Sequence, residues 1–252
     1  VLSPETPLRL LMAMEDRLAG FQEAGIEEVV ILEFNKAFAA LTPEEFVREI
    51  LRDGVGVKEL FVGEQFAFGR NRAGKIADLR RLGEEAGIRV HAVPAVRMGG
   101  EMVSATRIRT LVQAGEVRRA AQFLGRPYAI SGVVVQGEHR GQALGWPTAN
   151  LRLPSDRAIP ADGVYAAITI WNKRAFASVS YIGTRPTFGT GERLLEVYLL
   201  DEQVDLYDQQ IRVEFIDRLR GDLIFHSAEE LSARIQQDIL QARKTLRVAS
   251  GT

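Results

Sequence analysis

The sequence contains no cysteine among its 252 residues, and this absence excludes several kinds of chemistry at once. Disulfide bonds, zinc sites built from thiolates and cysteine nucleophiles all require a thiol. A chain without disulfides also fits the reducing environment of the cytoplasm. We therefore expect a cytoplasmic protein whose fold depends on an apolar core, for which 46% hydrophobic residues are sufficient.

The sequence also has no long apolar run, almost no net charge, and few tryptophan and tyrosine residues. No run of about 18 apolar residues occurs, so the sequence predicts no transmembrane helix. The 32 basic and 33 acidic residues nearly cancel, which gives no overall attraction to nucleic acid or to an anionic membrane. The two Trp and five Tyr form no stripe of basic and stacking residues of the kind that binds single-stranded RNA. We therefore expect small molecules as partners, and neither nucleic acid nor a membrane.

From Pro7 to about Leu124 the sequence alternates short apolar runs with helical patterns. Residues 42–45, Thr-Pro-Glu-Glu, form a capping box with proline at the first helical position, and Ser104 can cap a helix that ends before Gly115. The strand candidates are residues 28–32, 60–62 and 88–93. This alternation predicts an α/β domain in which helices flank a parallel sheet.

Residues 127–252 have a different period, without helices between their strands. The strand-length segments are residues 130–135, 164–171, 176–182, 194–200 and 211–216. Turns rich in Gly, Pro, Asp and Asn separate them, which predicts an antiparallel barrel or sandwich. A second capping box at residues 227–230 then begins a terminal helix. We place the domain boundary between residues 126 and 127.

The most informative segment is residues 137–150, GEHRGQALGWPTAN, which follows a predicted strand. Glycine lets backbone N–H groups wrap a phosphate because no Cβ blocks the ligand. Three glycines recur here at spacings of four: Gly137, Gly141 and Gly145. Thr148 and Asn150 add uncharged oxygens that suit Mg²⁺, which often bridges substrate phosphates. The alternative is a long hairpin loop that needs its glycines only for turns.

Glu196 is a second candidate, because six apolar or aromatic neighbours surround it in the strand segment 194–200. A carboxylate that is buried without a partner is costly. Glu196 should therefore face solvent, pair with a cation or point into a ligand pocket. A partly desolvated Glu can take a proton from a substrate hydroxyl, whereas a Glu on the outer face of a barrel can be merely solvated.

These segments together resemble the riboflavin kinases, whose nucleotide-binding signature contains Pro-Thr-Ala-Asn. The resemblance covers essentially all of residues 127–246 in the right order. Beyond residues 137–150 it runs through residues 163–166, 182–188, 195–201, 205–207, 219–220, Phe225 and the terminal helix. The family fold is a small antiparallel β-barrel with a C-terminal helix.

The resemblance implies that the protein transfers the γ-phosphate of ATP to riboflavin and so produces FMN. Glu196 matches the catalytic base that activates the ribityl 5′-hydroxyl, and Thr148 and Asn150 match residues that help hold Mg²⁺ and the ATP phosphates. The loop glycines would let the loop close over the nucleotide. Bacterial relatives often carry Arg at the position of Gln142, where its charge would help to bind the nucleotide phosphates. Arg140, two residues away, is the candidate to replace that charge.

Residues 1–126 resemble the adenylyltransferase half of the bacterial bifunctional riboflavin kinase/FMN adenylyltransferase. This half is an α/β nucleotidyltransferase-like (Rossmann-like) domain. The matching segments are residues 38–46, 62–69, 72–74 and 104–109. Ser104, Thr106 and Arg109 open a predicted helix, where free N–H groups and the helix dipole favour phosphate. Ordinary helix capping beside solvated arginines is the alternative.

The adenylyltransferase family also has a His-x-Gly-His motif after its opening strand, whose histidines stabilise the departing pyrophosphate. The three histidines of this sequence lack that context: His91, His139 and His226. Gln65 stands where relatives usually have Asp, and Ala105 replaces the second Ser of a Ser-Ser-Thr box. We therefore expect an α/β domain that lacks its first strand, and little adenylylation of FMN to FAD on this chain.

Two other interpretations stay open. The chain is a fragment of a fully bifunctional FAD synthetase whose His-x-Gly-His segment lies outside this sequence, or it is a non-catalytic flavin-binding barrel. No feature of the sequence indicates an oligomeric state.

Overall fold

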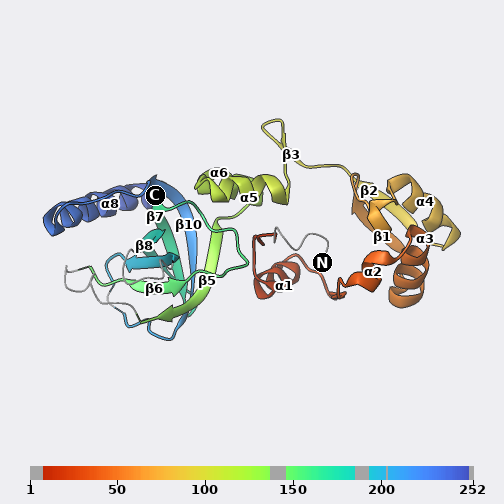
Figure 1. Ribbon diagram of the computed structural model, residues 1–252, viewed down its shortest axis with the longest axis horizontal. Helices are drawn as coiled ribbons and strands as arrows, with labels where there is room; N and C mark the ends of the chain where they lie inside the picture. The colour runs from red at the N-terminus through yellow and green to blue at the C-terminus, as the bar shows by residue number, and fades with distance from the viewer. Residues whose placement is uncertain (1–7, 137–145, 185–192, 203, 250–252) are drawn as a thin grey trace. The chain divides into compact units, whose positions relative to one another are not determined.

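The computed structural model describes residues 8–136, 146–184, 193–202 and 204–249 (Figure 1). The chain forms two compact units. One contains Phe21–Val103, and the other combines Leu8–Gly20 with Ser104–Thr252. Helix α1 (Met14–Glu23) contains the division after Gly20, so its residues are shared between the two units. The boundary between residues 126 and 127 stays a prediction.

The first unit holds a two-stranded parallel sheet with helices around it. Strands β1 (Glu59–Gly63) and β2 (Arg89–Val93) pair in parallel, with Leu60 opposite Val90. The other elements are α2 (Lys36–Ala40), α3 (Pro43–Glu45), the π-helix η1 (Phe46–Val55), the 3-10 helix η2 (Arg70–Arg72), α4 (Ile76–Glu85), and the hairpin of β3 (Arg97–Met98) and β4 (Glu101–Met102). The predicted parallel α/β arrangement is confirmed for these strands.

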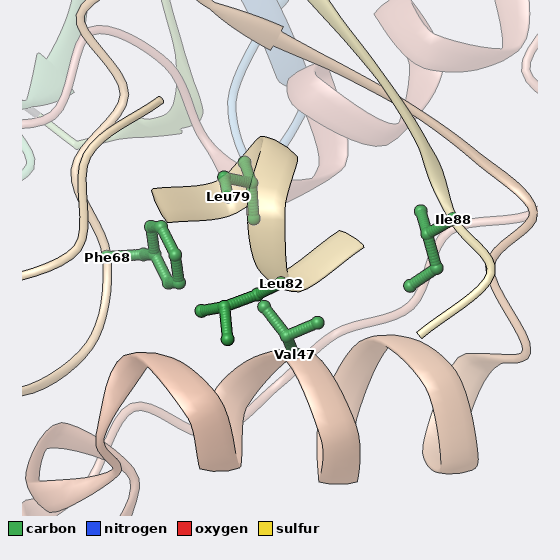
Figure 2. Close-up of a cluster of buried hydrophobic side chains, with 5 residues drawn as sticks. All are labelled: Val47, Phe68, Leu79, Leu82 and Ile88. Atoms are coloured by element: carbon green, nitrogen blue, oxygen red, sulfur yellow. The ribbon is translucent and has the colours of Figure 1, made fainter. Parts of the chain in front are cut away.

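The capping box at Thr42 is confirmed in detail. The Thr42 N–H donates to Glu45 Oε2 (2.8 Å), and the Glu45 N–H donates to Thr42 Oγ1 (3.2 Å). The box starts the helical turns that carry Val47 inward. There it meets side chains from α4 and from the flanks of β1 and β2, as Figure 2 shows: Phe68, Leu79, Leu82 and Ile88. This cluster is the core of the first unit.

The strand predicted at residues 28–32 is wrong. These residues form no strand, and Val30 and Ile31 are 55% and 64% exposed. An apolar run becomes a strand only when a neighbouring strand accepts its hydrogen bonds. Within the described part of the first unit, β1 pairs with β2 alone, so the run at 28–32 joins no sheet.

The second unit is built on a closed antiparallel barrel with strand order β10-β5-β6-β9-β8-β7. The strands are β5 (Tyr128–Val135), β6 (Ala149–Arg152), β7 (Gly163–Trp171), β8 (Arg174–Thr184), β9 (Arg193–Leu199) and β10 (Gln210–Arg220). Five strands match predicted segments, and the barrel is confirmed over the sandwich. Strand β6 was not predicted, because it has only four residues and begins inside the Pro-Thr-Ala-Asn segment.

The terminal helix α8 (Ala228–Ala249) packs on the outside of the barrel, beside β7, β8 and β10 (Figure 1). Its buried residues Ile239, Ala242 and Leu246 join a cluster with Ala166 of β7. The Glu230 N–H donates to Ser227 Oγ (3.1 Å), as a cap requires. The predicted box is incomplete, because the Glu230 carboxylate accepts from the His226 N–H rather than from that of Ser227.

Two further pieces pack on the barrel. Helices α5 (Ala105–Gln113) and α6 (Val117–Leu124) contact each other, and α6 contacts β5 and β10. The segment Leu8–Gly20 adds a parallel bridge, in which the Leu10 N–H donates to Asp156 O (2.7 Å) and the Ala158 N–H donates to Leu10 O (2.9 Å). No helix in the described parts of the chain has the length and apolarity of a membrane span.

Candidate active site on the outer face of the barrel

Three polar side chains form a row across neighbouring strands of the barrel. Asn150 of β6 lies opposite Glu196 of β9, and Glu196 lies opposite Tyr181 of β8. Residues that face each other across strands project from the same side of the sheet. Leu195 and Val197 on either side of Glu196 are buried inside the barrel. The alternation along β9 therefore puts the row on the outer face.

The Pro-Thr-Ala-Asn segment folds against Glu196. Thr148 Oγ1 lies 3.5 Å from Glu196 Oε2, and the Asn150 side-chain amide donates to the Thr148 carbonyl (3.4 Å). Asn150 is only 4% exposed, and its pairing with Glu196 in the ladder fixes its place. The structure thus brings together Thr148, Asn150 and Glu196, three of the six residues that the sequence singled out in this domain. They are separated by a long stretch of chain but meet through the pairing of β6 with β9.

Asp222 extends the row beyond Tyr181, and neither of these two residues was predicted from the sequence. The Tyr181 hydroxyl donates to Asp222 Oδ1 (3.0 Å). Burial, followed by this hydrogen bond and by the charges of Asp222, Glu196 and Asp162, raises the pKa of Tyr181 above its ordinary value. The phenol therefore stays protonated at neutral pH and acts as a donor. The sequence carries no signal for this pair, because the two residues meet only once β7 has paired with both β8 and β10.

A small cavity of about 210 Å³ lies next to Thr148. Its apolar walls are Val134, Pro147, Val197, Leu199 and Leu206. Two carboxylates, Glu202 and Asp205, also line it. Thr148 borders the cavity on one side and contacts Glu196 on the other. A ligand in the cavity would therefore lie close to the row of polar side chains.

The remaining predicted site residues fall into two groups. Gly137, Gly141 and Gly145 lie outside the described residues, as do His139, Arg140 and Gln142. In the described parts of the chain, no three His, Asp or Glu side chains gather closely enough to hold a metal ion by themselves. A metal at Thr148 and Asn150 would therefore need oxygens from a substrate.

Ser104, Thr106 and Arg109 do lie together, in the first turns of α5. Ser104 Oγ accepts from the Arg107 N–H (3.2 Å), which confirms the predicted cap. Arg109 Nη2 donates to Thr106 Oγ1 (3.3 Å). These residues belong to α5, whereas Thr148 and Asn150 contact β9. Their role in binding phosphate stays a prediction.

Comparisons with known proteins find a matching family model for each half of the chain. A family model described as riboflavin kinase matches residues 124–246, and one described as FAD synthetase matches residues 1–107. A crystal structure described as a macrolide-efflux protein from Streptococcus pneumoniae superposes with a TM-score of 0.85 and 30% identity. That match covers 92% of this chain and 75% of the other.

Curated relatives are similar over nearly the whole chain. The bifunctional riboflavin kinase/FMN adenylyltransferase of Pseudomonas fluorescens is 39% identical over 243 residues, which are 96% of this chain and 77% of the relative. The enzyme of the same name from Escherichia coli K12 is 36% identical over 95% of this chain and 76% of the relative. The resemblance inferred from the motifs is confirmed, and the chain belongs to the bifunctional riboflavin kinase/FMN adenylyltransferase family, with a riboflavin kinase domain built on the barrel.

Proposed function

We propose that Glu196, Thr148 and Asn150 form the centre at which the kinase domain transfers the γ-phosphate of ATP to the 5′-hydroxyl of riboflavin. The observation that supports this proposal is the contact of Thr148 Oγ1 with Glu196 Oε2 at 3.5 Å, beside the Asn150–Glu196 pair. A nucleotide phosphate held by the Pro-Thr-Ala-Asn segment would thus lie beside a carboxylate that can accept a proton.

Glu196 acts as the general base in this proposal. Its carboxylate accepts the proton of the ribityl 5′-hydroxyl as the hydroxyl oxygen bonds to the γ-phosphorus, and the bond between that phosphorus and the bridging oxygen of ADP breaks. Glu196 is partly buried on a strand whose neighbours Leu195 and Val197 are fixed in the core. A base on a rigid strand keeps its distance from the acceptor, and positioning supplies much of the rate in phosphoryl transfer.

The residues present fit Mg²⁺ bound together with ATP. Thr148 supplies a hydroxyl oxygen and Asn150 a side-chain amide oxygen, and both are hard, uncharged donors. Mg²⁺ commonly binds through a few protein oxygens, waters and substrate phosphates, and it neutralises charge on the phosphates. We propose that Thr148 and Asn150 hold the ion, while the N–H groups of the glycine loop contact the nucleotide phosphates.

The cavity beside Thr148 is proposed to take part of the nucleotide. Its apolar walls would pack against the faces of an aromatic base, and the carboxylates of Glu202 and Asp205 could accept hydrogen bonds from an exocyclic amine. Thr148 borders the cavity and contacts Glu196. A nucleotide whose aromatic base occupies the cavity would therefore direct its phosphates toward the Glu196 carboxylate.

The test is an assay with riboflavin, ATP and Mg²⁺ in which FMN and FAD are separated. The variant Glu196→Gln should lower FMN formation by about two to four orders of magnitude, the usual effect of losing a general base. Glu214→Gln is a matched control, because Glu214 also lies on a barrel strand and its carboxylate is hydrogen-bonded to Arg212 (3.2 Å), away from the Glu196 row. It should keep near-normal turnover. Normal turnover in Glu196→Gln would refute the proposed base.

The assay that separates FMN from FAD also tests the activity of the adenylyltransferase half. The FAD synthetase match over residues 1–107 shows that this domain is present. We propose that Ser104, Thr106 and Arg109 contact phosphate in that half, so Arg109→Ala should lower FAD more than FMN. The low FAD formation expected from the sequence stays a prediction, as do the cytoplasmic location and the lack of nucleic-acid and membrane partners.

A further inference from the structure

We infer that Asp222, held in place by Tyr181, binds the polyol chain of the acceptor and makes the kinase selective for flavins with secondary hydroxyls on that chain. The inference rests on the proposed function, because it takes Glu196 as the group that meets the terminal hydroxyl. It assigns a role to the two members of the row that the phosphate chemistry leaves unused.

The order of the strands separates the donor from the acceptor. Thr148 and Asn150 lie on the β6 side of Glu196, and Tyr181 lies on the β8 side. In phosphoryl transfer the attacking and leaving oxygens are roughly in line, on opposite sides of the phosphorus. With the nucleotide phosphates on the β6 side, the acceptor alcohol approaches from the β8 side. The remainder of its chain then passes Tyr181.

The position of the Tyr181 ring is fixed by a glycine two residues along the strand. A Cβ added to Gly183 would overlap the hydroxyl and the ring of Tyr181. The ring therefore lies along β8, over Gly183, where no side chain separates it from the backbone. In this position its hydroxyl reaches Asp222, which follows the end of β10.

Asp222 is held in place yet accessible. Its Oδ1 accepts from the Tyr181 hydroxyl (3.0 Å) and from the Leu223 N–H (3.0 Å), and the side chain is exposed. Among the residues that the structure describes, its Oδ2 has no hydrogen-bond partner. An ionised carboxylate oxygen is a strong acceptor for hydroxyl donors. Because Tyr181 and Leu223 fix the other oxygen, the group needs little reordering to bind a secondary hydroxyl.

The two residues that follow Asp222 in the chain are apolar and exposed. Leu223 is 48% exposed and Ile224 is 86% exposed, in the loop that precedes α8. Followed from Glu196 through Tyr181 to Asp222 and then along the chain, the order is thus a carboxylate, a polar pair and exposed apolar side chains. Riboflavin has the same order of groups: a terminal hydroxyl, a polyol chain and a flat aromatic ring system. This correspondence favours a flavin polyol over a simple alcohol as the acceptor.

The test compares riboflavin with a flavin whose side chain is 5-hydroxypentyl, which keeps the terminal hydroxyl and lacks the secondary ones. Asp222→Ala should lower kcat/KM for riboflavin about tenfold, as the loss of one hydrogen bond to a charged group predicts, and should change the hydroxypentyl flavin less than about twofold. The KM for ATP should not change. Tyr181→Phe keeps the ring, the carboxylate and its bond to Leu223, and should shift the same ratio in the same direction.

A double variant and a binding measurement sharpen the test. If Tyr181 acts through Asp222, Tyr181→Phe combined with Asp222→Ala should lose no more than Asp222→Ala alone. Dissociation constants from flavin fluorescence should show the same loss for riboflavin and none for the hydroxypentyl flavin, without relying on turnover. Equal losses for both flavins, or no loss for either, would overturn the inference while Glu196→Gln remains inactive. Retained activity in Glu196→Gln would instead overturn the proposed function.

Discussion

Replacing Asp238 by asparagine should weaken the attachment of α8 to the barrel. Asp238 is 2% exposed, and its Oδ2 lies 2.9 Å from both Nε and Nη2 of Arg220 on β10. Arg234, one turn earlier on α8, places its Nε 3.2 Å from Oδ1. The side chain of Arg220 is 11% exposed and that of Arg234 is 33% exposed. The substitution keeps the shape of the side chain and removes its charge.

The magnitude follows from the arginine that is left behind. Breaking a buried ion pair by removing one partner costs about 3–5 kcal/mol, because the other charge stays buried without compensation. Arg234 can turn to water, whereas Arg220 cannot, so we expect the lower end, about 3 kcal/mol. For a unit of this size that corresponds to a fall of roughly 6–12 °C in Tm.

Tryptophan fluorescence during urea or thermal unfolding measures this effect in the correct unit. Both tryptophans, Trp146 and Trp171, belong to the barrel unit. Trp146 also packs edge-on against Tyr198 (5.5 Å between ring centroids) and reaches Ser232 of α8 (3.5 Å). Its emission should therefore respond to detachment of the helix.

Asp201 provides the matched control, because it pairs with Arg243 on the same helix at the surface. Exposed ion pairs contribute little to stability, so Asp201→Asn should leave the midpoint nearly unchanged. An unchanged midpoint for Asp238→Asn, or equal shifts for both variants, would refute the view that the buried charge pair anchors α8.

Two further predictions concern the barrel. Gly183→Ala should displace the Tyr181 ring and lower kcat/KM for riboflavin about as much as Tyr181→Ala does. In the double variant, Gly183→Ala should lower kcat/KM by less than about twofold beyond Tyr181→Ala alone. Burial raises the pKa of Tyr165 from 10.0 to about 12, so the fold favours its protonated form. The stability from this group is complete below pH 10 and is lost as the pH rises toward 12. Urea midpoints of wild type and Tyr165→Phe at pH 9 and pH 11 test this: the difference between the two proteins should shift against wild type at pH 11, and an equal difference at both pH values would contradict it.

Local chemistry determined the parts of the fold that could be predicted. The capping box at Thr42 involves residues three apart and needs no tertiary information, and it forms as expected. The long barrel strands could be predicted because each is a strand-length segment bounded by turn residues, which is visible in its own stretch of sequence. In the same way, Glu196 stands out because its strand neighbours are apolar, and the pairing of β9 with β6 brings it to Thr148 and Asn150.

The features that were predicted wrongly or not at all depend on pairing between segments that are distant in the sequence. The run at residues 28–32 is as apolar as β1, yet only β1 obtains a strand partner. The short strand β6 takes its structure from pairing with β5 and β9, because four residues are too few to show a strand pattern of their own. Tyr181 and Asp222 are 41 residues apart, and no local pattern fixes the register that joins them. Register is a property of the assembled sheet, so single-sequence patterns did not contain it.

The bridge between Leu10 and the barrel has a consequence for the order of events on the ribosome. The segment Leu8–Gly20 emerges early, but its partners at Asp156 and Ala158 are synthesised well over a hundred residues later. Contacts across such sequence separations form slowly, because a large loop must first close. During synthesis the first unit, Phe21–Val103, can therefore fold before the segment that precedes it finds its final place.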